Sequence, residues 1–180
     1  MKTGLLSRIL VFCALATVGL GLDLWTKSLL FDRLGMPGRQ SVEWIVPGLF
    51  GFQTSLNEGA LFGIGQGYAW LFAALSILAA GGVLVWLFVY RAAEDWMLAV
   101  ALGCVMAGIF GNLYDRLGLH GLTWPENHPA AGEPVYAVRD FILVMIGTWP
   151  WPTFNIADSL LVVGAGLLLG HAVFYSESAP

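Results

Sequence analysis

The sequence predicts an all-α membrane protein with four transmembrane helices, a small extracytoplasmic β-sheet and an interfacial helix. Composition is the first reason: 58% of the 180 residues are hydrophobic and 11% are charged, whereas a soluble domain carries about 25% charged residues. The second is that four apolar segments can each cross about 30 Å of hydrocarbon, which takes about 20 helical residues. The third is that Trp and Tyr residues cluster at several ends of these segments, as at membrane–water interfaces.

The four expected spans cover residues 9–30, 68–90, 96–117 and 154–174 of one integral-membrane domain, 1–180. The first span is polar only in its second half, and the second has no charge. The third is polar only at its far end and the fourth only at its near end. Glycines in the fourth span suit close helix packing; they are Gly164, Gly166 and Gly170.

The N-terminal segment has two interpretations. Lys2 and Arg8 before an apolar run are typical of a cleaved signal peptide. This run is long, however, and it carries Asp23 and Lys27 where a cleavage site should lie, so we expect a retained helix. The same two basic residues favour a cytoplasmic N-terminus, and four spans then place both termini in the cytoplasm.

Polar residues concentrate on the outer side of the expected bundle, because consecutive spans alternate in direction. Ionisable groups within a membrane are candidates for a functional site. The residues gathered there are Asp23, Lys27, Asn57, Glu58, Asn112, Asp115, Arg116, Asp140, Asn155 and Asp158.

Each cluster of these residues also has a structural interpretation. Asp23 and Lys27 are spaced for an ion pair on one helix face. Asn155 and Asp158 suit a helix cap. Asp140 suits the cap of a short interfacial helix formed by the apolar residues after it.

Two more motifs can likewise be interpreted as functional or as only structural. "GNLYDRL" places Asn112 and Arg116 on one helix face with Asp115 beside them, and Arg116 could simply snorkel toward the headgroups. "NEGALFGIG" could be only a turn before the second span.

The two outer connections differ from ordinary loops. Residues 31–67 alternate short apolar runs with Pro and Gly, which predicts short strands on the membrane face. Residues 118–153 begin as a polar, Pro/Gly-rich flap and end in an apolar run that is too short to span.

Carboxylates are the recurrent reactive groups of the outer side. No Ser lies beside a His there, and the three histidines show no metal-ligand spacing. Two carboxylates sharing a site cannot both ionise cheaply, so one acts as a base and the other as an acid toward a water molecule and an amide carbonyl. This chemistry needs no metal and no cofactor. No basic cluster suggests a nucleic acid partner.

The motifs together resemble lipoprotein signal peptidase, or signal peptidase II, over nearly the whole chain. They are "DLWTKSLL", "NEGALFGIG", "GNLYDRL", "VRDFI" and "FNIADS", in this order. The resemblance implies an intramembrane aspartic endopeptidase that removes signal peptides from prolipoproteins, cutting before a diacylglyceryl-modified Cys. The implied localisation is the bacterial cytoplasmic membrane, with the site toward the extracytoplasmic face. The implied partners are the substrate and membrane lipids, and a monomer is expected.

The resemblance also implies residue roles. Asp140 and Asp158 match the catalytic pair. The other matching positions bind substrate or support the site: Asn57, Gly59, Ala60, Asn112, Asp115, Arg116, Asn155, Asp23 and Lys27. The family has a much shorter connection between Arg116 and Asp140, so residues 118–138 resemble an insertion.

Two functions of other classes remain alternatives. A small transporter or channel subunit could use the outer acids to bind a cation, although it would need ionisable groups along a path through the membrane. A membrane assembly scaffold could use the same polar residues only to lock its helices together.

Overall fold

The computed structural model describes residues 2–38, 42–59 and 65–175. The elements in chain order are α1 (Lys2–Leu34), β1 (Glu43–Val46), β2 (Phe50–Asn57), α2 (Ala69–Phe88), the 3-10 turn η2 (Ala92–Glu94), α3 (Trp96–Arg116), β3 (Val138–Ile146), β4 (Trp149–Pro150) and α4 (Ile156–Tyr175).

The chain divides into two compact units. The helical unit comprises Met1–Leu22, Ser76–Gly111 and Ile156–Pro180. The sheet unit comprises Asp23–Leu75 and Asn112–Asn155.

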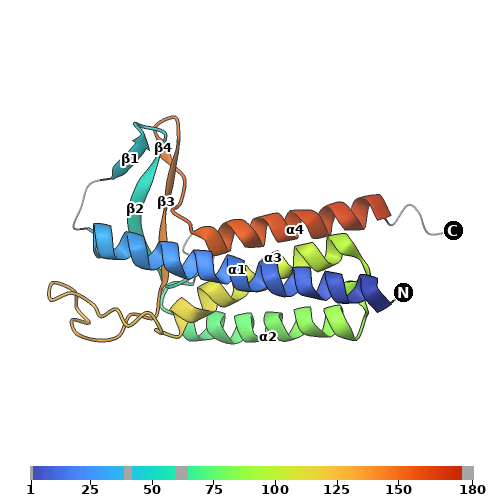
Figure 1. The fold of residues 1–180 in the computed structure, drawn as a ribbon. Coiled ribbons are helices and arrows are strands. Elements are labelled where there is room, and N and C mark those ends of the chain that lie inside the picture. The colour runs from blue at the N-terminus through green and yellow to red at the C-terminus, as the bar shows by residue number, and fades with distance from the viewer. Residues whose placement is uncertain (1, 39–41, 60–64, 176–180) are drawn as a thin grey trace. The chain divides into compact units, whose positions relative to one another are not determined.

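Among the residues that the structure describes, four helices are long and apolar enough to cross a membrane, as the sequence predicts. They are Gly4–Leu34, Ala69–Phe88, Trp96–Arg116 and Ile156–Phe174. Within the helical unit their segments lie side by side (Figure 1). In α3, 67% of the most apolar window is buried, against 11–22% in the other three helices. The centre of this unit is therefore α3, and few residues in the apolar windows of the other three helices are buried.

Close helix packing in the helical unit depends on particular glycines. A Cβ at Gly108 would lie 2.5 Å from the carbonyl oxygen of Ala157, and one at Gly164 would lie 2.6 Å from the Val105 side chain. These contacts join α3 to α4, as expected for Gly164. Gly166, in contrast, faces open space, so it has no such packing role.

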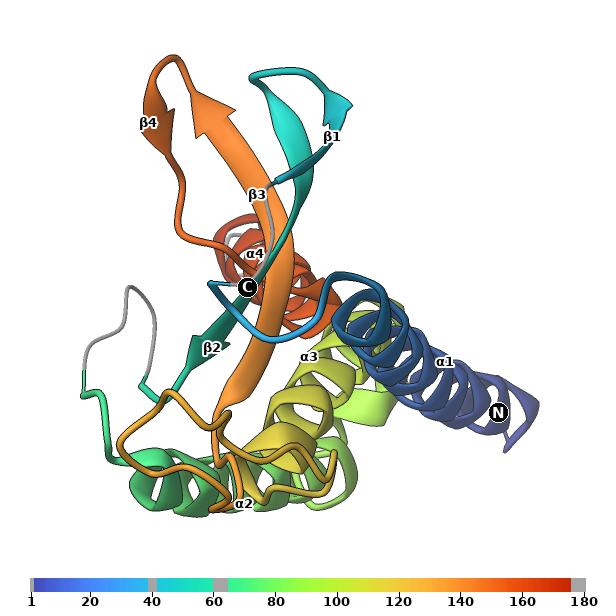
Figure 2. The ribbon, with the colours of Figure 1, turned by 90° about the vertical axis from the view of Figure 1, so that its left-hand side faces the viewer.

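The sheet unit contains a four-stranded antiparallel sheet with the order β1-β2-β3-β4 (Figure 2). β1 and β2 confirm the short strands predicted within residues 31–67. In the central pair, Ser55 lies opposite Asp140, and Asn57 lies opposite Val138. This register fixes which residues of β2 surround Asp140.

The prediction of an interfacial helix after Asp140 is wrong. Residues Val138–Ile146 form β3, and Trp149–Pro150 form β4. The stretch "VRDFILVMI" has β-branched residues at alternate positions (Val138, Ile142, Val144, Ile146), a composition that favours strands. Pairing with β2 satisfies the backbone groups of this segment.

Candidate active site

Six of the polar residues that the sequence singled out lie buried in the sheet unit. They come from the second half of α1, the end of α3, the middle of β3 and the residue before α4. Chain segments far apart in sequence therefore each contribute a polar side chain to this unit. These residues are Asp23, Lys27, Asn112, Asp115, Asp140 and Asn155.

Lys27 is the central cation of this group. Its Nζ lies 2.7 Å from Asp23 Oδ2 and 3.2 Å from Asp115 Oδ2. It also donates a hydrogen bond to Asn112 Oδ1 at 3.1 Å. A buried ammonium is tolerated only when it is paired and hydrogen-bonded, so the ion pair predicted for Asp23 and Lys27 is confirmed and extends to α3.

Arg139 completes the charge balance, and the sequence interpretation did not select it. Its Nη2 and Nε lie 2.9 and 3.1 Å from Asp115 Oδ1, and its backbone N–H donates to Asp115 Oδ2 at 2.9 Å. Two acids and two bases then share one buried cluster: Asp23, Lys27, Asp115 and Arg139. The position of Arg139 directly before Asp140 in the sequence was the signal that could have identified Arg139 as part of the site. Side chains alternate along a strand, so Arg139 and Asp140 belong to opposite faces of β3.

A line of hydrogen bonds connects Lys27 to Asp140. Asn155 Nδ2 donates to Asn112 Oδ1 at 3.1 Å and to Asp140 Oδ1 at 2.6 Å. An ammonium can only donate, so the Asn112 atom that faces Lys27 must be the oxygen. The Asn155 atom that faces this oxygen must then be the amide nitrogen. Lys27 thus fixes the orientation of both amides. Asn155, held in this orientation, presents an amide N–H group to Asp140.

Backbone pairing brings Asn155 beside Asp140. Phe154 N donates to the carbonyl oxygen of Ile142 at 3.1 Å, and Ile142 N donates to that of Phe154 at 2.8 Å. These bonds tie the chain just before α4 to β3. They are long-range contacts that the pattern around either residue does not reveal.

Three of the remaining predicted residues are connected by hydrogen bonds. Arg116 Nη2 donates to the carbonyl oxygen of Gly59 at 3.1 Å, and Asn57 Oδ1 accepts from Gly59 N at 3.0 Å. Ala60 lies outside the described residues. Asp158 is half-buried in the first turn of α4, in the helical unit.

Outside the spans, His120 has a shifted pKa. Burial lowers the pKa of His120 from its ordinary value of 6.5, and the charges of Arg139 and Lys27 add to this effect while Asp115 opposes it. Its Nδ1 accepts a hydrogen bond from Leu122 N at 3.0 Å, which suits the neutral ring. In the part of the chain that the structure describes, no group of three His, Cys, Asp or Glu side chains could hold a metal ion.

The fold defines the chain as a multi-pass membrane protein. Two solved structures, each described as a bacterial membrane enzyme structure, have TM-scores of 0.73 and 0.71 to this chain. Their sequences are 24% and 25% identical to this one. The matches cover 97% and 93% of this chain, and 93% of each of the two solved chains.

Sequence comparison gives the family. The pattern of Peptidase_A8, described as signal peptidase (SPase) II, matches residues 15–174. A lipoprotein signal peptidase of Rhodopirellula baltica is 48% identical over 91% of this chain and 71% of its own length. Proteins of that name in Symbiobacterium thermophilum and Geobacillus thermodenitrificans are 37% and 32% identical, over 88% and 94% of this chain and 91% and 93% of their own lengths. The chain belongs to the signal peptidase II family and is a protease of that type.

Proposed function

We propose that the chain removes signal peptides from diacylglyceryl-modified prolipoproteins, with Asp140 and Asp158 as its catalytic carboxylates. The observation that carries the assignment of the site is the hydrogen bond between Asn155 and Asp140. It connects the motif "VRDFI" to the motif "FNIADS", in which Asp158 follows Asn155 by three residues. The transporter and scaffold alternatives are not favoured, because the family is one of proteases.

The two carboxylates have different roles in this proposal. A carboxylate oxygen that accepts a hydrogen bond from an amide is stabilised in its ionised form. We assign Asp140, whose Oδ1 accepts from Asn155, as the base and Asp158 as the partner acid. Asp140 takes a proton from water as the oxygen attacks the scissile carbonyl carbon, and Asp158 donates its proton to the carbonyl oxygen. The tetrahedral intermediate then breaks its C–N bond: the leaving amine receives a proton from Asp140, and one hydroxyl of the intermediate returns its proton to Asp158, so both acids end as they began.

The test of this proposal replaces each acid singly, as Asp140→Asn and Asp158→Asn. Each variant should lose cleavage of a diacylglyceryl-modified prolipoprotein by several orders of magnitude, because an amide can neither take up nor release the required proton. Protein abundance is measured alongside. Full-rate processing by either variant would exclude that residue from catalysis, and loss of abundance without loss of specific activity would favour the scaffold interpretation.

The site faces the extracytoplasmic side in this proposal, and both ends of the chain face the cytoplasm. The lipid chains of the substrate stay in the bilayer, and the exposed apolar side chains of α2 and α4, such as Leu78 and Val162, contact membrane lipids. The active form is a monomer.

A further inference from the structure

The segment between α3 and β3 is an ordered hairpin. Trp124 N donates to the carbonyl oxygen of Glu133 at 2.9 Å, and Val135 N donates to that of Leu122 at 3.0 Å. Within the hairpin, the rings of Trp124 and His128 stack with centroids 3.9 Å apart and 12° between their planes. We call residues 122–135 the Trp124 hairpin. It lies within the part of the sequence that resembles an insertion.

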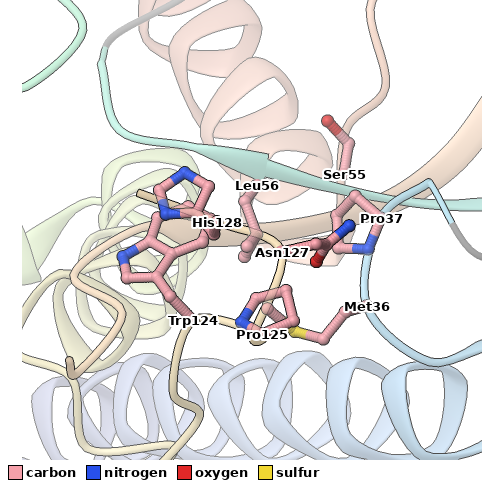
Figure 3. A pocket seen from close by; sticks show the side chains of 8 residues that line it. All are labelled: Met36, Pro37, Ser55, Leu56, Trp124, Pro125, Asn127 and His128. Atoms are coloured by element: carbon pink, nitrogen blue, oxygen red, sulfur yellow. The ribbon is translucent and has the colours of Figure 1, made fainter. Parts of the chain in front are cut away.

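Trp124 borders two hollows in the sheet unit. The first, of about 340 Å³, is shown in Figure 3, where Trp124 and His128 lie at one side and Met36 and Pro37 at another. The second, of about 290 Å³, is lined by Glu58, Gly67, Ala69, Trp124, Glu133, Pro134 and Tyr136.

The first hollow lies along the end of β2, which pairs with the strand of Asp140, and the second is lined by Glu58, the residue that follows β2. Ser55 and Leu56 line the first hollow, and in the ladder they lie opposite Asp140 and Arg139. Paired strands are about 4.8 Å apart, and an extended chain advances about 3.3 Å per residue. A polypeptide with its scissile bond at Asp140 therefore reaches the hollows within a few residues.

The second hollow has the chemistry to receive a cation. Its lining includes the carboxylates of Glu58 and Glu133, the aromatic rings of Trp124 and Tyr136, and no basic side chain. Among the described residues, neither carboxylate takes part in an ion pair. Lys and Arg side chains bind carboxylates and also lie favourably on aromatic faces.

We propose that the Trp124 hairpin forms a recognition subsite for the mature part of the substrate, downstream of the cleaved bond, and that its second hollow takes a Lys or Arg side chain. This proposal rests on the proposed function. The occupant is the substrate chain because the hollows continue from the strand pair that carries Asp140, and a basic side chain complements the two carboxylates.

The experiment uses one lipidated prolipoprotein whose second to sixth mature residues are changed one at a time to Lys, Ala or Glu. The wild-type enzyme should show, at one position or at two neighbouring ones, a KM about three- to tenfold lower for Lys than for Glu, with kcat unchanged. Glu133→Gln should remove the preference, and Glu133→Lys should reverse it. Glu126→Gln is the matched control, because Glu126 is an exposed acid of the same hairpin that lines neither hollow.

The outcomes separate this subsite from the proposed function. If the wild-type enzyme cleaves none of these substrates, the proposed function fails. If it cleaves all of them with one KM, or if Glu133→Lys leaves the preference for Lys intact, the subsite is wrong. An effect of Glu126→Gln equal to that of Glu133→Gln would also overturn it, because general attraction by the acidic surface would then explain the preference.

Discussion

At the scale of single residues, the buried cluster around Lys27 is held together by charge balance. Asp23 and Asp115 each contact Lys27, and Asp115 also holds Arg139. Removal of one member leaves a buried charge without compensation, which costs about 3–5 kcal/mol. Removal of one acid and one base together leaves the net charge of the cluster unchanged. This difference allows the stabilising role of Lys27 to be separated from its effect on Asp140.

We therefore predict different results for a single and a double substitution. Lys27→Met should strongly reduce abundance, whereas Asp23→Leu combined with Lys27→Met should restore much of it. The double variant should still lose about 10- to 100-fold in kcat, because Asn112 and Asn155 are no longer held in the orientation that donates to Asp140, and a hydrogen bond to a charged group contributes about 1.5–3 kcal/mol. Abundance and single-turnover cleavage measure the two effects. A double variant with wild-type turnover would show that Lys27 only stabilises the fold.

At the scale of elements, the contact between α3 and α4 depends on the absence of a side chain at Gly108. We predict that Gly108→Ala lowers the free energy of unfolding by about 1–3 kcal/mol, since the new methyl group overlaps the carbonyl oxygen of Ala157. Gly166→Ala is the control because that glycine faces open space. Thermal unfolding in detergent compares the two, and equal melting temperatures would contradict close packing at Gly108.

Elements also differ in how far the sequence predicts them. The helices follow from apolar length, and β1 and β2 follow from apolar runs punctuated by Pro and Gly. The strand β3 was missed because Asp140 before an apolar stretch also suits a capped helix. The pairing partners decided the outcome: β2 pairs with residues 138–144 and β4 with Met145 and Ile146, whereas a short helix is marginally stable without tertiary packing.

At the scale of the whole molecule, the proposed orientation can be measured. Glu126, in the Trp124 hairpin, and Glu94, between α2 and α3, are both exposed. In a background with Cys13 and Cys104 replaced, Glu126→Cys should react with a membrane-impermeant maleimide applied from the extracytoplasmic side, and Glu94→Cys should react only after the membrane is opened. The reverse pattern would place the site on the cytoplasmic side.

The sequence by itself determined the four spans, their aromatic ends and the motifs that carry Asp140 and Asp158, because hydropathy and short spacings are local properties of the chain. Only the tertiary structure decided that Arg139 pairs with Asp115, that Asn155 donates to Asp140 and that Trp124 borders two hollows near β2. Those contacts join residues that are distant in sequence, and they depend on strand register and side-chain packing. No local pattern specifies register or packing, since both arise when separate segments compete for the same buried partners.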